Sequence, residues 1–219
     1  MTEPDFLDAT RVFYDAVAVD YAERFREELG VRPLDRAMLA GFAEFVRADG
    51  GGTVADLGCG PGQVTGQLRD LGLTVFGVDL SPQMIEVARR AHPELRFDVG
   101  SMTDLDLPDG SLGGIVAWYS IIHVPQERLP EVLAEFQRAL APGGHLLLAF
   151  QVGDEPLHVA QPLGHPVSLD FQRLQPDHIV GLLSQAGLVV RARLVREPGD
   201  GNTERTQQAF LLARKPPPA

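Results

Sequence analysis

The spacing of apolar residues in the first fifty positions predicts two amphipathic helices. Phe13, Val17, Tyr21 and Phe25 fall four residues apart, so they form one apolar stripe on a helix whose other faces carry acids and arginines. A second helix is expected to begin near Pro33, because proline suits the first turn of a helix, and to end at the run of glycines that follows it. The segment is therefore read as a helix, a turn and a helix.

From residue 53 onward, short apolar runs alternate with helical stretches. The expected strands are 53–57, 73–80, 95–99, 114–119 and 145–152, and the expected helices are 64–71, 83–91 and 127–140. Strands that alternate with helices imply right-handed crossovers and a parallel sheet covered on both faces. The pattern therefore predicts an α/β fold.

This alternation ends after residue 152. Residues 153–175 form a long connection with one short alternating run at 167–171, and a helix is expected at 176–186. Two strands follow, at 188–195 and 206–213, and the turn-rich segment EPGDGN joins them. That segment is too short to hold a crossover helix, so the two strands must form an antiparallel hairpin.

These patterns describe one domain without internal repeats. It spans residues 1–219. Its parts are an N-terminal helical cap (1–50), a core that carries the candidate binding motifs (51–152), a candidate substrate loop (153–175), and a C-terminal helix and hairpin (176–215). With 44% hydrophobic residues, a chain of 219 residues is long enough for one well-packed domain.

Charge and cysteine content narrow the function classes. The formal net charge is −11, and an acidic surface repels phosphate backbones, which argues against a nucleic-acid substrate. The single cysteine, Cys59, allows no intramolecular disulfide and suits a reducing compartment. The sequence shows no signal peptide and no apolar stretch long enough for a membrane helix. We therefore expect a cytoplasmic protein that acts neither on nucleic acid nor at a membrane.

The most informative segment is VADLGCGPGQVT, in which an expected strand ends at Asp56 and Gly58, Gly60 and Gly62 follow. Glycine lets a backbone turn tightly and press against a ligand. A dinucleotide site would have the spacing G-x-G-x-x-G, and here Pro61 also removes one N–H donor. The Asp56 carboxylate would repel a diphosphate and attract an amino group. The loop is therefore expected to bind a nucleoside without phosphates.

A second acidic residue supports this interpretation. Asp79 ends the next expected strand, where a carboxylate can accept hydrogen bonds from both hydroxyls of a ribose. On its own an aspartate at a strand end is weak evidence, but it gains weight beside the glycine loop.

Four stretches together resemble the class I S-adenosylmethionine (SAM) dependent methyltransferases. They are DLGCGPG, GVDLSPQMIEVAR, GSMTDLDLPDGS and LAPGGHLLLAF, and the similarity is close over roughly residues 40–152. The resemblance implies a Rossmann-like fold, a mostly parallel seven-stranded sheet whose last strand is antiparallel, and SAM as the cofactor.

The resemblance also nominates cofactor-binding residues. Asp56 and the three glycines would meet the methionine part and the ribose of SAM, Asp79 would hold the ribose diol, and three residues would lie beside the adenine, namely Leu80, Ser101 and Met102. The first helix resembles the cap helix of small-molecule members, whose tyrosines close over the cofactor, which nominates Tyr14 and Tyr21. The alternative for both tyrosines is simple packing of an amphipathic helix.

The strand at 114–119 should end beside the cofactor. It would place Trp118 near the cofactor and Tyr119 near the substrate. His123 is the candidate catalytic base because it titrates near neutral pH, and its alternative is a capping role before the next helix. His158 and His165, in the long connection, are candidate substrate-binding residues, with solvated loop positions as the alternative. No histidines and acids have metal-ligand spacing, so we expect no metal site.

The leading functional prediction is a transferase that moves a methyl group from SAM to O, N or C of a small, partly apolar metabolite. A second hypothesis keeps SAM but replaces methyl transfer with a cyclisation or rearrangement. A dinucleotide-dependent oxidoreductase conflicts with the glycine spacing, and a non-catalytic SAM sensor is the remaining alternative. The sequence specifies neither the acceptor nor the oligomeric state.

Overall fold

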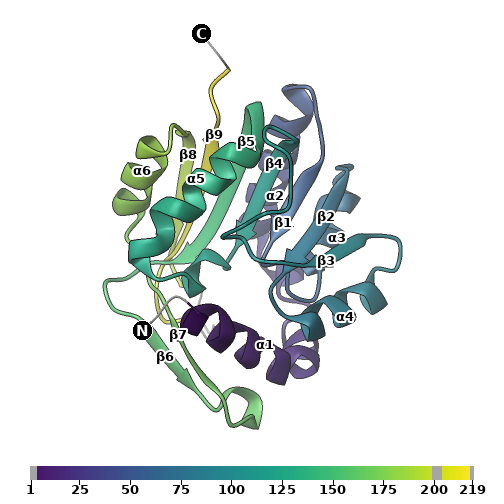
Figure 1. Ribbon diagram of the computed structural model, residues 1–219, viewed down its shortest axis with the longest axis vertical. Helices are drawn as coiled ribbons and strands as arrows, with labels where there is room; N and C mark the ends of the chain where they lie inside the picture. Colours follow the sequence, from purple (N-terminus) through teal and green to yellow (C-terminus); the bar gives the residue numbers. More distant parts are fainter. Residues whose placement is uncertain (1–3, 199–203, 218–219) are drawn as a thin grey trace.

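The computed structural model describes residues 4–198 and 204–217, and its centre is a seven-stranded sheet in the order β3-β2-β1-β4-β5-β9-β8 (Figure 1). The strands are β1 (Val54–Leu57), β2 (Val75–Asp79), β3 (Arg96–Val99), β4 (Leu112–Trp118), β5 (Leu140–Gln151), β8 (Val189–Arg196) and β9 (Gln208–Arg214). Strands β1 to β5 pair in parallel, and β9 runs antiparallel to both β5 and β8. The predicted fold, with its antiparallel C-terminal hairpin, is confirmed.

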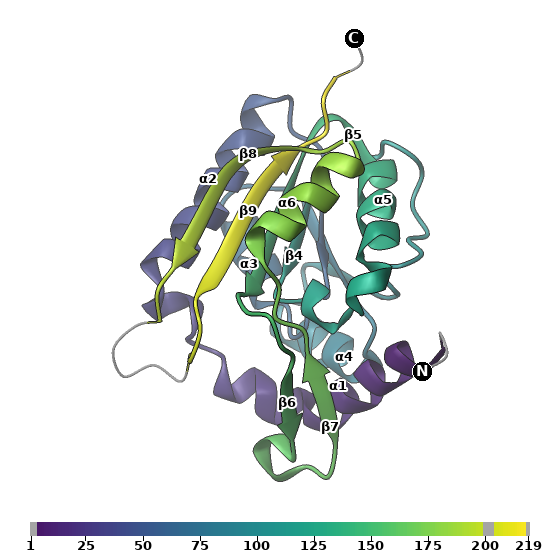
Figure 2. The ribbon, with the colours of Figure 1, turned by 90° about the vertical axis from the view of Figure 1, so that its left-hand side faces the viewer.

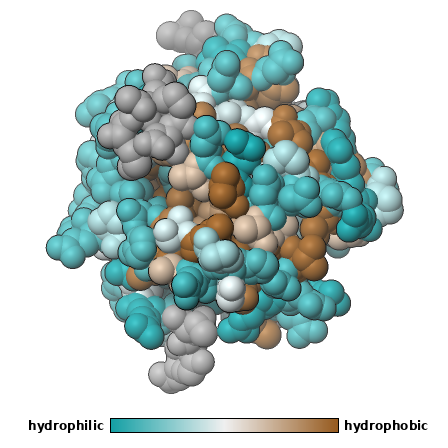
Figure 3. Space-filling view, turned by 60° about the horizontal axis from the view of Figure 1, so that its bottom comes forward, coloured by the Kyte–Doolittle hydropathy of each residue, from teal (hydrophilic) through white to brown (hydrophobic). Residues whose placement is uncertain are grey.

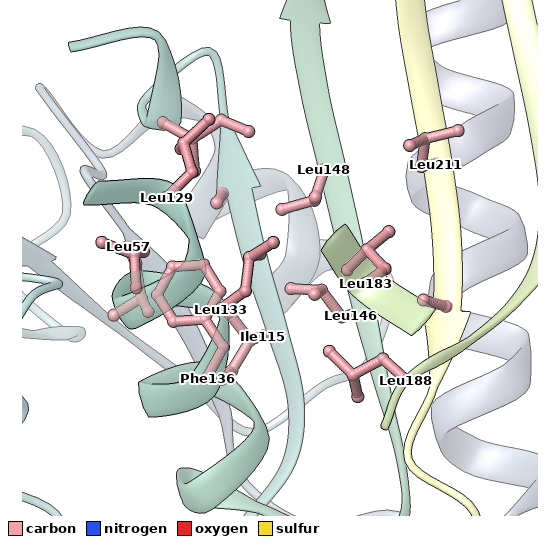
Figure 4. Packing of buried hydrophobic residues seen from close by; sticks show 14 of the residues in the cluster. Leu57, Ile115, Leu129, Leu133, Phe136, Leu146, Leu148, Leu183, Leu188 and Leu211 are labelled. Carbon is pink, nitrogen blue, oxygen red and sulfur yellow. The ribbon is translucent and has the colours of Figure 1, made fainter. Parts of the chain in front are cut away.

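Helices cover both faces of the sheet (Figures 1 and 2). The helices beside the sheet are α2 (Pro33–Ala48), α3 (Gln63–Asp70), α4 (Pro82–Ala91), α5 (Leu129–Ala139) and α6 (Pro176–Gln185). In the larger core cluster, Leu133 and Phe136 of α5 and Leu183 of α6 pack against β4 and β5 (Figure 4). Helices α2 and α3 form a second apolar cluster with the other face. This burial is the main source of the fold's stability.

Strand β4 begins with glycines because its neighbours come too close for side chains. A Cβ atom on Gly113 would lie 2.3 Å from the carbonyl oxygen of Gly51, and one on Gly114 would lie 2.7 Å from Cζ of Phe42 in α2. The paired glycines therefore let α2 and the turn before β1 pack tightly against the sheet.

Strand β5 starts earlier than the expected range of 145–152. Its first residue, Leu140, already pairs with Leu112, and the register then shifts so that His145 pairs with Gly114. Gly143, with a φ of +86°, lies within this shift. The Pro-Gly-Gly segment at 142–144 is therefore an irregularity within the strand.

The cap helix α1 (Pro4–Arg24) lies across the end of the molecule where β1, β2 and β4 finish. The connection 153–175 is largely a hairpin of β6 (Leu157–Ala160) and β7 (Ser168–Phe171) alongside α1 (Figures 1 and 2). The alternating run explains this arrangement, because its apolar residues Val167, Leu169 and Phe171 pack against Phe13 and Val17 of α1. The described residues also form four short 3-10 helices: Leu29–Val31, Ile121–His123, Gln126–Arg128 and Pro162–Gly164.

Apolar side chains also reach the surface at this end of the molecule. Figure 3 shows them gathered within a polar rim, and Val12, Val19 and Leu163 are among the exposed ones on α1 and the β6–β7 hairpin. Among the described residues, no helix combines the length and the apolar content that crossing a bilayer requires.

Candidate functional site

A cavity of about 130 Å³, the first cavity, lies between α1 and the ends of β1, β2 and β4. The structure brings most of the predicted site residues together around it. They are Tyr14, Tyr21, Asp56, Gly58, Gly60, Asp79, Leu80, Ser101, Met102, Trp118, Tyr119 and His123. Since parallel strands end at one edge of a sheet, residues far apart in sequence meet here.

The glycine loop after β1 is shaped by positive φ angles of +73° at Gly58, +53° at Gly60 and +85° at Gly62. A Cβ on Gly58 would lie 2.3 Å from Cβ of Ser120, so only glycine fits beside the end of β4. A Cβ on Gly60 would meet no atom within 4 Å. Gly62 does not line the cavity. It precedes α3, where a Cβ would come within 2.9 Å of Cζ of Phe97, so its role is packing.

Asp79 lies at the end of β2 with its carboxylate held by two backbone N–H groups. Gly60 N donates to Oδ2 and Ser81 N donates to Oδ1, each at 2.8 Å. Burial nevertheless raises the pKa of Asp79 to about 6. Each carboxylate oxygen accepts more than one hydrogen bond, so Asp79 keeps acceptor capacity for a ligand hydroxyl.

Asp56, at the end of β1, is fully buried, and one of its two oxygens lacks a partner. Thr65 Oγ1 donates to Oδ2 at 2.6 Å, whereas Oδ1 has no hydrogen-bond partner among the described residues. Burial raises the pKa of Asp56 to about 7. A buried carboxylate oxygen without a donor is costly, so this wall of the cavity favours a ligand with a positive charge or an N–H group.

The cap is attached to the core through Asp15, which the sequence did not single out. Its Oδ1 accepts from Ser81 Oγ at 2.6 Å and from Gln83 N at 3.2 Å. Ser81 Oγ in turn accepts from Met84 N at 3.1 Å and so caps the N-terminus of α4. A single carboxylate on α1 therefore fixes the cap to the first turn of α4, next to Asp79.

The cap also meets the core through Tyr14 and His123, whose Oη and Nε2 atoms are 2.7 Å apart. Burial raises the pKa of Tyr14 well above its usual value and lowers that of His123 to about 3. Both groups are therefore neutral at physiological pH, and the tautomer of the imidazole decides which of them donates. The Phe171 ring packs edge-on against His123 at 4.8 Å, and His123 Nδ1 has no partner among the described residues.

A second cavity of about 400 Å³ adjoins the first. Tyr14, Tyr21, Trp118 and Tyr119 line both cavities. Tyr119 has a φ of +53°, an uncommon value for a side-chain-bearing residue, and its buried hydroxyl has no partner in the described part of the chain. Backbone strain of this kind at a cavity wall is typical of functional sites.

Comparisons with known proteins agree with this geometry. The model of a methyltransferase domain family matches residues 54–144. An uncharacterized methyltransferase of Mycobacterium tuberculosis H37Rv is 35% identical over 120 residues, which are 53% of this chain and 47% of that protein. An O-methyltransferase of Penicillium expansum is 32% identical over 145 residues, 63% of this chain and 52% of that protein.

The family model over residues 54–144 and these relatives support the predicted class I SAM-dependent methyltransferase family. The cofactor of that family is SAM. The chain spans about half the length of these curated relatives. The magnesium protoporphyrin IX methyltransferase of Synechocystis, solved with bound SAM, superposes with a TM-score of 0.70 at 17% identity, covering 96% of this chain and 97% of that one. A [4+2]-cyclase superposes with a TM-score of 0.69 at 18% identity, covering 95% and 96%. At such identities these two structures show the fold alone.

His158 and His165, the predicted substrate-binding histidines, lie away from both cavities. His158 Nδ1 is 2.6 Å from Asp170 Oδ1, and His165 Nε2 is 2.7 Å from Asp20 Oδ2. His158 stands opposite Asp170 in the β6–β7 register, on the face of the hairpin that turns away from α1. Strand periodicity thus takes its side chain away from the site, which the sequence interpretation of a loop did not anticipate.

The described residues contain no group of three or more His, Cys, Asp or Glu side chains arranged to hold a metal ion. Cys59 is buried in the glycine loop, and burial raises the pKa of its thiol well above the usual value. A Cβ on Gly77 would lie 2.7 Å from its Sγ, so Cys59 fills the space beside β2.

Proposed function

We propose that this chain binds SAM in the first cavity and transfers its methyl group to O, N or C of a small, partly apolar molecule in the second cavity. The observation that carries the proposal is that the two cavities adjoin and share lining residues, among them Tyr14, Tyr21, Trp118 and Tyr119. Two ligands bound in adjoining cavities would have their reacting atoms close together, which is the main requirement of a transfer reaction.

The residues of the first cavity fit SAM. The Asp56 Oδ1 atom, which lacks a described donor, suits the amino group of the methionine part, and Asp79 suits the ribose hydroxyls. The open space beside Gly60 gives the ligand access to the loop backbone. Leu80, Ser101 and Met102 would flank the adenine.

When bound, SAM supplies a methyl group on a sulfonium, which is a good leaving group. The protein's own task is to orient the acceptor and to exclude water. Helix α1 is fixed by Asp15 and by the Tyr14–His123 hydrogen bond. It covers the first cavity and so helps to exclude water.

We propose that His123 removes the proton of a hydroxyl acceptor as the acceptor oxygen takes up the methyl group. An imidazole with a pKa of about 3 is neutral at physiological pH. It is a weak base, but a weak base suffices when proton removal accompanies methyl transfer, because the acceptor becomes strongly acidic as the new bond forms. In the tautomer whose Nε2–H donates to Tyr14 Oη, the ring is held in place and the lone pair on Nδ1 is free to accept the proton.

Three observations support a small acceptor. The net charge of −11 disfavours a nucleic acid, the cap covers the cofactor side, and the second cavity is of the size that small ligands use. The cytoplasmic location stays a prediction from the sequence.

Calorimetric titration with SAM, S-adenosylhomocysteine and NADH is the direct test. We expect micromolar binding of the first two and none of NADH. The absence of SAM binding would refute the proposal. Because a [4+2]-cyclase shares the fold, release of S-adenosylhomocysteine during turnover is the second measurement, and product formation without it would favour a cyclisation or rearrangement.

A further inference from the structure

The second cavity contains three acidic side chains, and each is held by an arginine. Arg196 bonds Asp35 at 3.0 Å and Glu204 at 2.7 Å. Arg32 bonds Glu28 at 2.6 Å and also contacts Glu204. This network gives the acids of the cavity their counterions.

Arg173 is different, because it forms no salt bridge or hydrogen bond with any residue in the described ranges 4–198 and 204–217. It lines the second cavity, and its Nε atom is buried without a partner. Arg205 lines the same cavity, is exposed, and pairs with no described residue. A partly buried guanidinium without a counterion is unfavourable, so this wall is complementary to an anion.

Two neutral polar groups that line the same cavity as Arg173 are also unsatisfied. The Gln151 Oε1 atom and the Tyr119 hydroxyl are buried, line the second cavity and have no hydrogen-bond partner among the described residues. The phenol can donate to a carboxylate alongside a guanidinium, whereas the Gln151 oxygen accepts from an N–H or O–H group of a ligand. Buried polar groups are normally paired, so three unpaired groups around one cavity point to a missing polar ligand.

The rest of the wall is apolar, with Phe25, Leu29, Ile122, Leu157 and Phe171 among its residues. We propose that the second cavity binds an acceptor with a carboxylate on an apolar body, and that Arg173 binds this carboxylate. The inference deepens the proposed function and rests on it, because it names the class of acceptor for the same site.

Gly153 gives Arg173 its place. A Cβ at position 153 would lie 2.8 Å from Cδ and 3.0 Å from Cβ of Arg173. The φ of Gly153 is not positive, so alanine is compatible with the backbone there. Gly153→Ala should therefore displace the Arg173 side chain while leaving the charge of the protein unchanged.

The test uses the full chain saturated with S-adenosylhomocysteine and titrated with benzoate, cinnamate and octanoate, each compared with its primary amide. We expect at least one carboxylate to bind about tenfold or more tightly than its amide. Arg173→Gln should remove this preference while the affinity for S-adenosylhomocysteine is unchanged. Arg90→Gln, which removes the same charge from the exposed surface of α4, should preserve the preference.

The proposal is overturned if no carboxylate exceeds its amide, or if Arg173→Gln and Gly153→Ala both keep the preference. Circular dichroism of each variant checks that it folds, and Gly153→Ala provides the same test should Arg173→Gln be unstable. Failure of S-adenosylhomocysteine to bind would instead contradict the proposed function. A carboxylate preference measured on the protein alone would then still stand, so the two failures are distinguishable.

Discussion

The two cavities that share a wall are built in opposite ways. The first is built around the glycine loop and the ends of neighbouring strands, with Asp56 in β1 and Asp79 as the last residue of β2. The second takes its side chains from segments spread between Tyr14 and Gln208. The first presents the unpaired Asp56 Oδ1 atom, whereas the second presents the Arg173 guanidinium, which pairs with no described residue.

This difference teaches how the two sites would respond to mutation. A backbone-built site depends on glycine positions and strand ends, so single substitutions there should affect binding and folding together. A site built from dispersed side chains can change its ligand by substitution while the fold is kept. The predictions below test this contrast.

The largest expected effect is that of Gly58→Ala. The new Cβ would lie 2.3 Å from Cβ of Ser120, whose hydroxyl is bonded to Leu57 O at 2.6 Å, and the φ of +73° adds strain. We expect a loss of about 2–4 kcal/mol in the free energy of unfolding, together with weaker SAM binding. Urea denaturation measures the first quantity and calorimetry the second.

Gly60→Ala is the matched control, because its φ of +53° carries the same kind of strain without a steric clash. It should cost only about 1–2 kcal/mol. Equal losses for the two variants would mean that the close approach to Ser120 does not matter.

His123→Ala tests the junction between the cavities. We expect the rate of S-adenosylhomocysteine release, measured with the best acceptor, to fall about 100-fold because the base is lost. The affinity for SAM should stay within about twofold. Tyr14→Phe removes only the hydroxyl that bonds Nε2 and should slow turnover less. If His123→Ala weakens SAM binding as much as it slows turnover, His123 has a structural role.

Asp79→Ala should weaken SAM binding by about 1–3 kcal/mol, because the ribose hydroxyls lose a buried acceptor. The control is Asp98→Ala on β3, since Asp98 pairs with Arg96 at the surface. Calorimetry at one pH compares both variants with the parent protein. An unchanged affinity in Asp79→Ala would show that the ribose lies elsewhere.

SAM binding should also depend on pH through Asp56. Its pKa in the ligand-free protein is about 7, so the carboxyl is increasingly protonated below that pH. A bound ammonium group lowers this pKa, and binding therefore releases a proton in the range below pH 7. Affinity should rise on the order of tenfold from pH 5.5 to 7.5. Asp56→Asn should flatten this rise, and an equally steep profile in that variant would assign it to other groups such as Asp79.

Sequence patterns predicted the sheet, the hairpin and most of the first cavity, because glycine spacing and strand ends are local features. They did not predict the hairpin at 157–171, Asp15 or Arg173. The role of each depends on contacts with distant segments, such as Ser81 for Asp15 and Gly153 for Arg173. Gly62 was expected to contact the cofactor. In the structure it lies against Phe97 of β3, and the glycine motif itself gives no information about this distant strand.

Asp15→Ala should have the smallest effect. It tests what the cap contributes apart from the rest of the first cavity. The change removes the bonds to Ser81 Oγ and Gln83 N, while Ser81 still caps α4 through Met84 N. We expect a loss of about 1 kcal/mol in stability and a severalfold weaker binding of SAM. Asp8→Ala on the same helix removes only a surface pair with Arg11 and should change neither quantity. If binding of SAM is unaffected in Asp15→Ala while stability falls, the cap contributes to folding but does not help to hold the cofactor.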